Sequence, residues 1–235
     1  MTRPRHASTV VLIRPNASDR FEILLTRRLR QMRFMGGFYV FPGGAVHDSD
    51  YSAKVLARCR GLSAEDARAI LGGRHEPEIA LGHWVAAIRE LFEEVGILLC
   101  VTEAGEEVNT RNEELKARLE VKRRLMIREQ LDFGAFLETE RLYCDLSRQA
   151  YFFHRVTPEL YPIRFDTRFY LAPLPLHQTP LQRSEEVDEI LWVTPEDGMA
   201  RADRRDFPLV PPTTTVLEQL SKTQSWQALK AQYGL

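Results

Sequence analysis

The chain has 235 residues, of which 44% are apolar and 28% charged, values that are ordinary for a soluble globular protein. Its 32 basic and 33 acidic residues give a net charge of -1, so it lacks the basic excess typical of nucleic-acid-binding proteins. With no secretion signal and no apolar run near the roughly 20 residues of a membrane span, we expect a cytoplasmic protein that binds a small ligand, with no nucleic acid or membrane partner.

The N-terminal region is predicted to form a β-hairpin. Residues 8–13 and 21–26 are rich in β-branched and apolar side chains, and Asn16-Ala17-Ser18-Asp19 between them is typical turn sequence. A glycine-rich segment, residues 36–44, follows the hairpin. Glycines allow the backbone to approach a ligand closely, so this segment is a candidate binding loop.

Two helical segments are predicted next. Residues 51–76 have the pattern of a helical insertion, with Ser63 and Asp66 as a capping pair and Gly72 as a stop. Pro77 suits the first turn of a long helix that runs to about residue 95, and Gly96 lies just past its end.

The C-terminal half mixes helices and strands. Thr110 and Glu113 resemble a capping box that opens a charged helix ending near residue 130. Strands are predicted at 151–156, 168–171 and 190–193, a short helix from Thr194, and a last helical stretch after Pro211-Pro212. This mixture predicts an α/β or α+β domain.

Three glutamates in the long helix are the most informative residues. Glu90, Glu93 and Glu94 stand at i, i+3 and i+4, so they share one helix face, while an apolar stripe faces elsewhere. Clustered like charges cost about 0.2–0.5 kcal/mol per exposed pair, and a hard divalent cation would reverse that cost. A solvated acidic face is the alternative interpretation.

The pattern Arg89-Glu90-x-x-Glu93-Glu94-x-Gly96 resembles the second half of the Nudix box, and Gly44 with Asp50 resembles its first half, here interrupted by the predicted insertion. The resemblance implies a Nudix α/β/α sandwich with a mixed central sheet, a single domain over residues 1–235, and helical insertions at about 51–76 and 108–148. It also implies hydrolysis of a diphosphate, with Mg²⁺ or Mn²⁺ held by Glu90, Glu93 and Glu94 and with Arg89 orienting these glutamates. Glu93 and Arg89 are therefore predicted to be catalytic.

A second pattern precedes the box. Leu24-Leu25-Thr26, Arg28, Arg33, Gly37 and Phe41-Pro42-Gly43-Gly44 are similar in spacing to the signature of coenzyme A diphosphatases in this family, with Leu29 as the one departure. The predicted substrate-binding residues are Arg28, Arg33, Gly37, Phe41, Gly43 and Gly44. Arginines suit phosphate oxygens because their donors are charged. Alternatively, the arginines are surface charges and the apolar residues are core.

Later residues extend this resemblance to the long-insertion branch of the family. Thr157-Pro158 and residues 164–170 carry it, and Arg168 either binds substrate or pairs with acids. Glu186, in a loop-like stretch with Glu185, is predicted as a catalytic base or further metal ligand; a solvated acidic loop is the alternative.

The favoured substrate is coenzyme A or an acyl derivative. ADP-ribose or a dinucleotide diphosphate is a second possibility, and a non-catalytic nucleotide sensor is a third, although a sensor has no need of metal-binding acids. The six histidines show no ligand spacing, and His47, His83 and His154 are expected to be structural. The three cysteines form no CxxC pair, so we expect free thiols in a reducing compartment.

Overall fold

A seven-stranded mixed sheet forms the centre of the protein in the computed structural model, which describes residues 3–235 except 33, 203, 205 and 206. Strands β1 (Arg5–Pro15) and β9 (Phe165–Pro173) run parallel in its middle, and every other neighbouring pair is antiparallel. The main strand order is β10-β2-β1-β9-β8, with β3 beside β2 and β4 beside β1. The remaining strands are β2 (Phe21–Arg28), β3 (Tyr39–Val40), β4 (Gly43–Ala45), β8 (Ala150–Val156) and β10 (Val187–Val193).

The predicted N-terminal hairpin is confirmed. Strands β1 and β2 pair antiparallel with Ile13 opposite Ile23, and the turn between them is closed by Asn16, whose side chain accepts from two backbone N–H groups. β1, β9 and β10 are longer than predicted because neighbouring strands extend their hydrogen-bond ladders over polar residues such as Arg5 and Asp166. Composition alone does not reveal such extensions.

Helix α3 (Pro77–Val95) has the bounds predicted from the sequence. Pro77 occupies the first turn, where its missing N–H costs no hydrogen bond, and Gly96 ends the helix in the left-handed region at φ 74°. The apolar stripe that includes Trp84, Ile88 and Leu91 is buried against the sheet. The helix is thereby held rigidly along β1.

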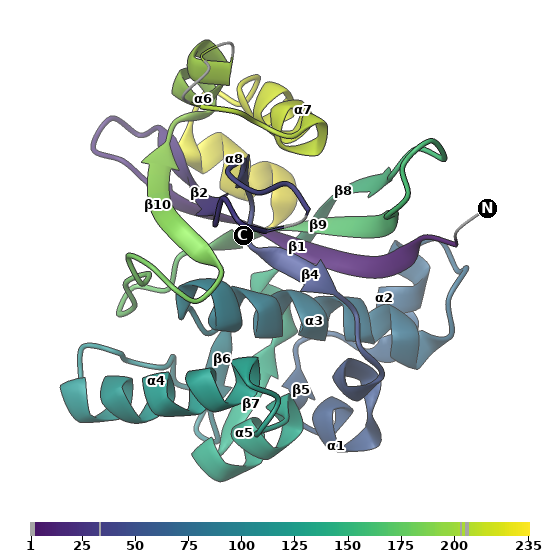
Figure 1. Ribbon diagram of the computed structural model, residues 1–235. Helices are drawn as coiled ribbons and strands as arrows, with labels where there is room; N and C mark the ends of the chain where they lie inside the picture. Colours follow the sequence, from purple (N-terminus) through teal and green to yellow (C-terminus); the bar gives the residue numbers. More distant parts are fainter. Residues whose placement is uncertain (1–2, 33, 203, 205–206) are drawn as a thin grey trace.

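Helices cover both faces of the sheet, which confirms the expected α/β/α sandwich (Figure 1). One core lies between the sheet and α3 and includes Val10 and Leu12 of β1; the other includes Val11 and Ile13 and packs against Leu217 of the C-terminal helices. Successive residues of one strand thus contribute side chains to two different cores. The helices of the second face are α6 (Pro195–Ala202), α7 (Pro211–Leu220) and α8 (Trp226–Tyr233), so the predicted last helical stretch consists of two helices.

The two segments predicted as helical insertions also contain strands. β5 (Cys59–Arg60) from the first and β7 (Leu142–Asp145) from the second form a small sheet with β6 (Cys100–Thr102), in the order β5-β7-β6. Strands this short carry no readable alternation, which is why the sequence pattern missed them. Their other elements are η1 (Asp48–Tyr51), α1 (Ala53–Leu56), α2 (Ala64–Ile70), α4 (Glu113–Ile127), α5 (Phe133–Glu140) and η2 (Leu146–Arg148).

All three cysteines are neighbours in this small sheet, where Cys144 lies opposite both Cys59 and Cys100. They are free thiols, two of them buried and Cys59 half-buried, as expected. The small sheet therefore joins the two insertions beside the main core.

The predicted start of α4 is wrong. The N-cap is Asn112, whose side-chain oxygen accepts from the backbone N–H of Leu115, whereas the Thr110 hydroxyl donates to the carbonyl of His177. Both residue types can cap a helix, and only the path of the chain decides between them. The other predicted cap is confirmed, since Ser63 accepts from the backbone N–H of Asp66.

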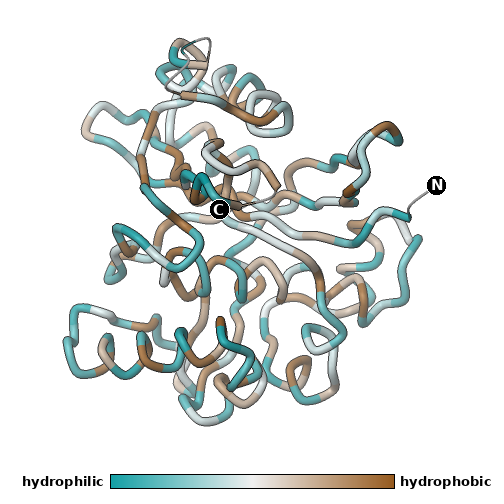
Figure 2. Tube along the Cα trace, in the orientation of Figure 1, coloured by the Kyte–Doolittle hydropathy of each residue, from teal (hydrophilic) through white to brown (hydrophobic). Residues whose placement is uncertain are grey.

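The hydropathy of the chain follows these layers. Figure 2 shows hydrophilic loops around the periphery and a hydrophobic tip on the β8–β9 hairpin, where Leu160 and Ile163 are exposed. Among the described residues, no helix combines the length and apolar character needed to cross a membrane.

Candidate functional site

A cavity of about 480 Å³ opens where the C-terminal half of α3 meets the sheet. Its walls come from β1, the 34–45 segment, the β8–β9 hairpin, the first turn of α7 and Glu186. Polar and apolar side chains both line it, including Glu90, Glu94, Arg28, Phe34, Tyr161 and Pro211. The cavity thus presents carboxylates, guanidinium groups and an apolar wall to one ligand.

Arg89 organises the carboxylates beside this cavity. Its Nη1 donates to Glu90 Oε1 and to Glu93 Oε2, both at 2.9 Å, and its Nη2 donates to the carbonyl of Ala45, also at 2.9 Å. The Arg89 side chain is only 6% exposed. The guanidinium therefore holds two of the three predicted metal ligands, as expected from the sequence.

Asp50 completes the arrangement from the first half of the box. Both of its oxygens accept from Arg89, from Nε at 2.7 Å and from Nη2 at 2.9 Å, and the carboxylate is fully buried. The intervening insertion thus folds so that the two halves of the box meet in a bidentate ion pair. Asp50 supports Arg89 and does not line the cavity.

Burial and mutual repulsion raise the pKa of all three helix glutamates. Burial raises the pKa of Glu90, and Arg89 opposes this effect. Burial also raises the pKa of Glu94, and the charge of Glu90 raises it further. For Glu93 the effect of burial outweighs that of Arg89 and brings the pKa to about 7. Burial disfavours charge on Arg89 too, but Glu90 and Asp50 outweigh it and its pKa is raised. Without a cation, the site therefore disfavours the ionised form of these carboxylates, which a bound cation would stabilise.

This donor set fits a hard divalent cation. Within the described part of the chain, Asp50 and the three helix glutamates are paired with the guanidinium groups of Arg89 and Arg28. If all four carboxylates are ionised, two formal negative charges remain in a buried site. Carboxylate oxygens on a rigid helix are ligands that Mg²⁺ and Mn²⁺ accept. Glu90 and Glu94 line the cavity, whereas Glu93 does not line it and accepts a hydrogen bond from Arg89.

The glycines of the box let the backbone lie against the carboxylates. A Cβ on Gly44 would lie 2.4 Å from Glu90 Oε1, so any side chain there would displace the glutamate. The backbone N–H of Gly43 donates to Glu94 Oε2 at 3.3 Å. Gly43, Gly44 and Phe41, for which the sequence predicts substrate binding, all line the cavity.

Arg28 is locked in place at the cavity. Its Nη1 lies 3.9 Å from Glu94 Oε1 and its Nε donates to the carbonyl of Phe34. Gly37, at φ 81°, returns the chain so that its N–H donates to the carbonyl of Arg28. Gly37 thus shapes the loop without lining the cavity, and the predicted phosphate ligand Arg33 lies outside the described residues.

The structure does not bring Arg168 to the cavity. Alternate residues of β9 face opposite sides of the sheet, and Phe165, Thr167 and Phe169 are the ones that line the cavity. Arg168 points the other way, where it pairs with Asp166 and His75. Of the two roles left open by the sequence, the structure therefore shows the pairing with an acid.

The two adjacent loop acids have different surroundings. Glu186 lines the cavity and contributes to the raised pKa of Glu94. Glu185 instead accepts from Nη2 of Arg123 at 3.0 Å. The sequence named both acids, and only the packing of this loop separates them.

Arg123 is a residue that the sequence analysis missed. Its side chain is 2% exposed, and its Nη1 donates to the backbone carbonyl of Glu93 at 2.5 Å while its Nε donates to Glu120. It therefore ties α4 of the second insertion to α3 and, through Glu185, to the loop that carries Glu186. In the sequence it is one of many charges on a polar helix, which gave no signal.

Two further arginines line the cavity, and no sequence motif pointed to them. Arg5, whose guanidinium lies over the ring of Phe165, and Arg155 line it together with Arg28. The only available signal was the alternation of Arg5, Ala7 and Thr9 along one strand face. Three of the described arginines thus line the cavity and can face an anionic ligand.

A helix-flanked mixed sheet with an Arg-Glu-x-x-Glu-Glu helix at its cavity defines a Nudix hydrolase. A NUDIX hydrolase from Alicyclobacillus acidocaldarius has the same fold, with 32% identity and a TM-score of 0.76 over 97% of this chain and 95% of that chain. The profile of the NUDT19 Nudix domain matches residues 4–220. The chain therefore belongs to the Nudix hydrolase family, within the group of NUDT19 Nudix domains.

Curated relatives agree with this placement. The acyl-coenzyme A diphosphatase NUDT19 of Gallus gallus is 30% identical over 82% of this chain and 59% of its own length. The protein of that name from Xenopus laevis is 27% identical over 87% of this chain and 60% of its own length. A putative nudix hydrolase 7 of Caenorhabditis elegans is 27% identical over 90% of this chain and 59% of its own length. The chain thus spans less than two thirds of these relatives.

The first prediction concerns the buried ion pair. Asp50→Asn removes the charge that faces Arg89 and should lower the free energy of unfolding by about 3 kcal/mol, because the guanidinium stays buried with less compensation. Urea unfolding measures this. Glu22→Gln, which breaks the half-exposed pair with Arg14, is the control and should cost at most about 1 kcal/mol. Equal losses in the two variants would contradict the role of Asp50.

The second prediction concerns pH. The pKa of Glu93 is raised to about 7 in the folded protein, so its protonated form favours folding. That contribution is fully present below the pKa of the unfolded chain, near 4.5, and is lost as pH rises through about 7. In the presence of a chelator, the free energy of unfolding of the wild type should therefore fall between pH 5 and pH 8 by on the order of 1–3 kcal/mol relative to that of Glu93→Gln. A pH-independent difference in the free energy of unfolding would refute this.

Proposed function

We propose that this protein is a metal-dependent diphosphatase that hydrolyses coenzyme A or an acyl derivative. The observation that carries the proposal is one cavity lined by two box glutamates, Glu90 and Glu94, by the described arginines Arg5, Arg28 and Arg155, and by an apolar wall. The names of the relatives from Xenopus laevis and Gallus gallus support it. The products would be 3′,5′-ADP and a 4′-phosphopantetheine or its acyl derivative.

Each group of the site has a role in this proposal. Glu90, Glu93 and Glu94 would hold Mg²⁺ or Mn²⁺, which neutralises the negative charge that develops on the phosphates. Arg89 keeps two of these glutamates in place through its hydrogen bonds. Arg28 binds a phosphate oxygen and helps offset the charge of the diphosphate.

Glu186 is proposed as the general base. Among the described acids that line the cavity, Glu186 is the one outside α3, where Glu90 and Glu94 are proposed to hold the metal, so it can take a proton from the water that attacks phosphorus. The bond from that phosphorus to the bridging oxygen then breaks, and the departing phosphate leaves with its charge spread over its oxygens. Arg123 fixes the loop through Glu185 and so keeps Glu186 at the cavity.

The shape and polarity of the cavity favour coenzyme A over ADP-ribose. Arg5 and Arg155, in addition to Arg28, suit the 3′-phosphate that ADP-ribose lacks. Phe34, Met35, Tyr161, Val210 and Pro212 form an apolar wall that suits a pantetheine or acyl arm better than a second ribose. A non-catalytic sensor would have no need of the buried glutamates of α3, whose negative charge is not fully compensated.

The general-base role is tested with a matched pair of adjacent residues. Glu186→Gln should lower kcat by about 10²–10⁴-fold with little change in KM, because the amide cannot accept the proton. Glu185→Gln keeps an oxygen that accepts from Arg123, so its loss should stay within about tenfold. Initial rates at saturating Mg²⁺ and Mn²⁺ measure both. Similar losses in the two variants would remove Glu186 from the mechanism.

The substrate assignment is tested by comparing coenzyme A, its 3′-dephospho form and ADP-ribose, with products identified by mass. A charge-assisted contact to the 3′-phosphate contributes about 1.5–3 kcal/mol, so coenzyme A should exceed the other two roughly ten- to a hundredfold in kcat/KM. Arg155→Gln should reduce the advantage in kcat/KM of coenzyme A over its 3′-dephospho form and over ADP-ribose. Arg60→Gln, whose guanidinium stacks on Tyr143 away from the cavity, is the control. If ADP-ribose is cleaved equally well, the substrate assignment fails while the hydrolase assignment stands.

A further inference from the structure

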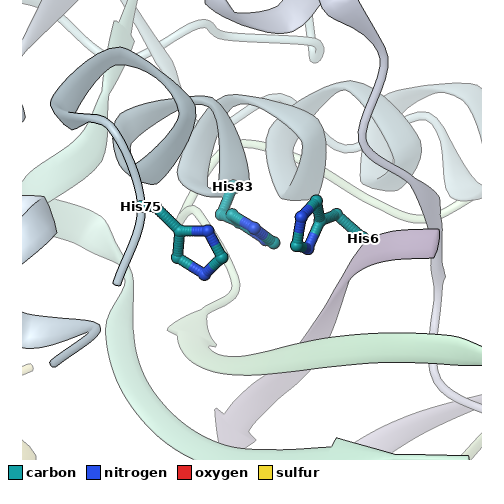
Figure 3. A group of neighbouring side chains, drawn as sticks. All are labelled: His6, His75 and His83. Carbon is teal, nitrogen blue, oxygen red and sulfur yellow. The ribbon is translucent and has the colours of Figure 1, made fainter. Parts of the chain in front are cut away.

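Three histidines that are distant in sequence converge beside α3 (Figure 3). They lie on the face of the sheet opposite to the cavity, because His6 alternates along β1 with the cavity-lining residues Arg5 and Ala7. His6 comes from β1, His75 from the loop after α2, and His83 from α3. Their ring centroids lie 4.9, 5.3 and 5.5 Å apart, and one nitrogen of each ring lies within 4.8 Å of a nitrogen of each other ring. Among the described residues, this is the group of histidines that the fold brings within reach of one ion.

Two of the ring nitrogens are buried without a hydrogen-bond partner. These are Nδ1 of His6 and Nε2 of His83, and His83 is fully buried. The other nitrogen of His83 is occupied by the hydroxyl of Ser8 at 3.1 Å, which leaves Nε2 facing inward. A buried polar atom without a hydrogen-bond partner destabilises the folded protein, so these two nitrogens point to a ligand.

Asp166 and Arg168 are charged side chains that lie beside the histidine group. Asp166 Oδ2 lies 3.7 Å from Nδ1 of His6, and Asp166 is itself paired with Arg168 and His154. Burial lowers the pKa of all three histidines, Arg168 lowers it further, and that of His83 falls to about 3. Neutral imidazoles have the free lone pairs that a metal requires.

We propose that His6, His75 and His83 form a structural binding site for a divalent transition-metal ion of the Zn²⁺ type. Imidazole nitrogen suits Zn²⁺ and is a poor ligand for Mg²⁺, so this site differs in chemistry from the carboxylates of α3. Asp166 is the nearest carboxylate and can supply a fourth ligand.

Metal binding requires small rearrangements that the surroundings allow. Ligand nitrogens around Zn²⁺ stand about 3.4 Å apart for bonds near 2.0–2.1 Å, so the rings draw together by roughly an ångström. Arg168 donates to Nε2 of His75 at 2.9 Å, and this contact is exchanged for the metal if that nitrogen binds. His75 lies in a loop and is half-buried, so it has room to turn.

The ion would fasten the first insertion to the sheet and to α3. His83 lies about two turns before Glu90 on α3, so the bound ion would hold the helix that carries the box glutamates. Its expected effect is on stability, and the proposal does not depend on the hydrolase substrate.

The experiment uses the full chain, stripped with chelator and then given excess Mg²⁺ to occupy carboxylates. Titration with Zn²⁺ by calorimetry should show one ion per chain at micromolar Kd or tighter, together with a rise in Tm. Co²⁺ should give the intense visible bands of a nitrogen-rich tetrahedral site. His75→Gln should weaken Zn²⁺ binding at least tenfold and lose the Co²⁺ bands, and His6→Asn should do the same.

His177→Gln is the matched control, because His177 is also a half-buried loop histidine but lies outside the group. It should bind Zn²⁺ as the wild type does. Circular dichroism of each metal-free variant establishes that the loss is not misfolding; His75 and His6 are chosen over the fully buried His83 for that reason. Zn²⁺ that is displaced by Mg²⁺, or that binds His75→Gln as tightly as wild type, would overturn the proposal.

Discussion

The buried guanidinium of Arg89 is the interaction on which the rest of the site depends. It donates to Asp50, Glu90, Glu93 and the carbonyl of Ala45, so one side chain joins η1, α3 and β4. A guanidinium supplies five donors in a fixed plane, which a lysine cannot reproduce. Because the group is almost fully buried, each carboxylate it holds is costly to remove, and the geometry of the site is correspondingly rigid.

The insertions belong to this architecture and are not appended to it. Phe136 of α5 stacks on Phe92 of α3 at 5.0 Å, and Arg123 of α4 donates to the backbone of Glu93. The second insertion thus contacts the same helix as the box. Its position also holds the loop with Glu185, so an element without cavity residues influences where Glu186 lies.

The central pair of parallel strands serves two separate sites. In β1 and β9 the odd-numbered residues from Arg5 to Thr9 and from Phe165 to Phe169 line the cavity, while His6, Asp166 and Arg168 face the histidine group. The period of two along a strand makes this separation unavoidable. A change that acts on one face therefore acts on the other only through the backbone of these strands.

The sequence by itself determined the long helix, its bounds and the common face of Glu90, Glu93 and Glu94. These depend on local rules, namely a proline at the start, a glycine at the end and a period of 3.6 residues. It also determined the hairpin and a mixed α/β or α+β class, because apolar periodicity is a local property. The sandwich itself was implied by the family resemblance. The family resemblance related Gly44 and Asp50 to that helix only as a spacing of residues.

Tertiary structure alone decided which distant residues meet. The pairing of Asp50 with Arg89 spans the first insertion, Arg123 reaches Glu93 from another helix, and His6, His75 and His83 come from three elements. It also turned Arg168 away from the cavity and separated Glu185 from Glu186. Spacing along a chain says nothing about such contacts, since they depend on how the elements pack after each has formed.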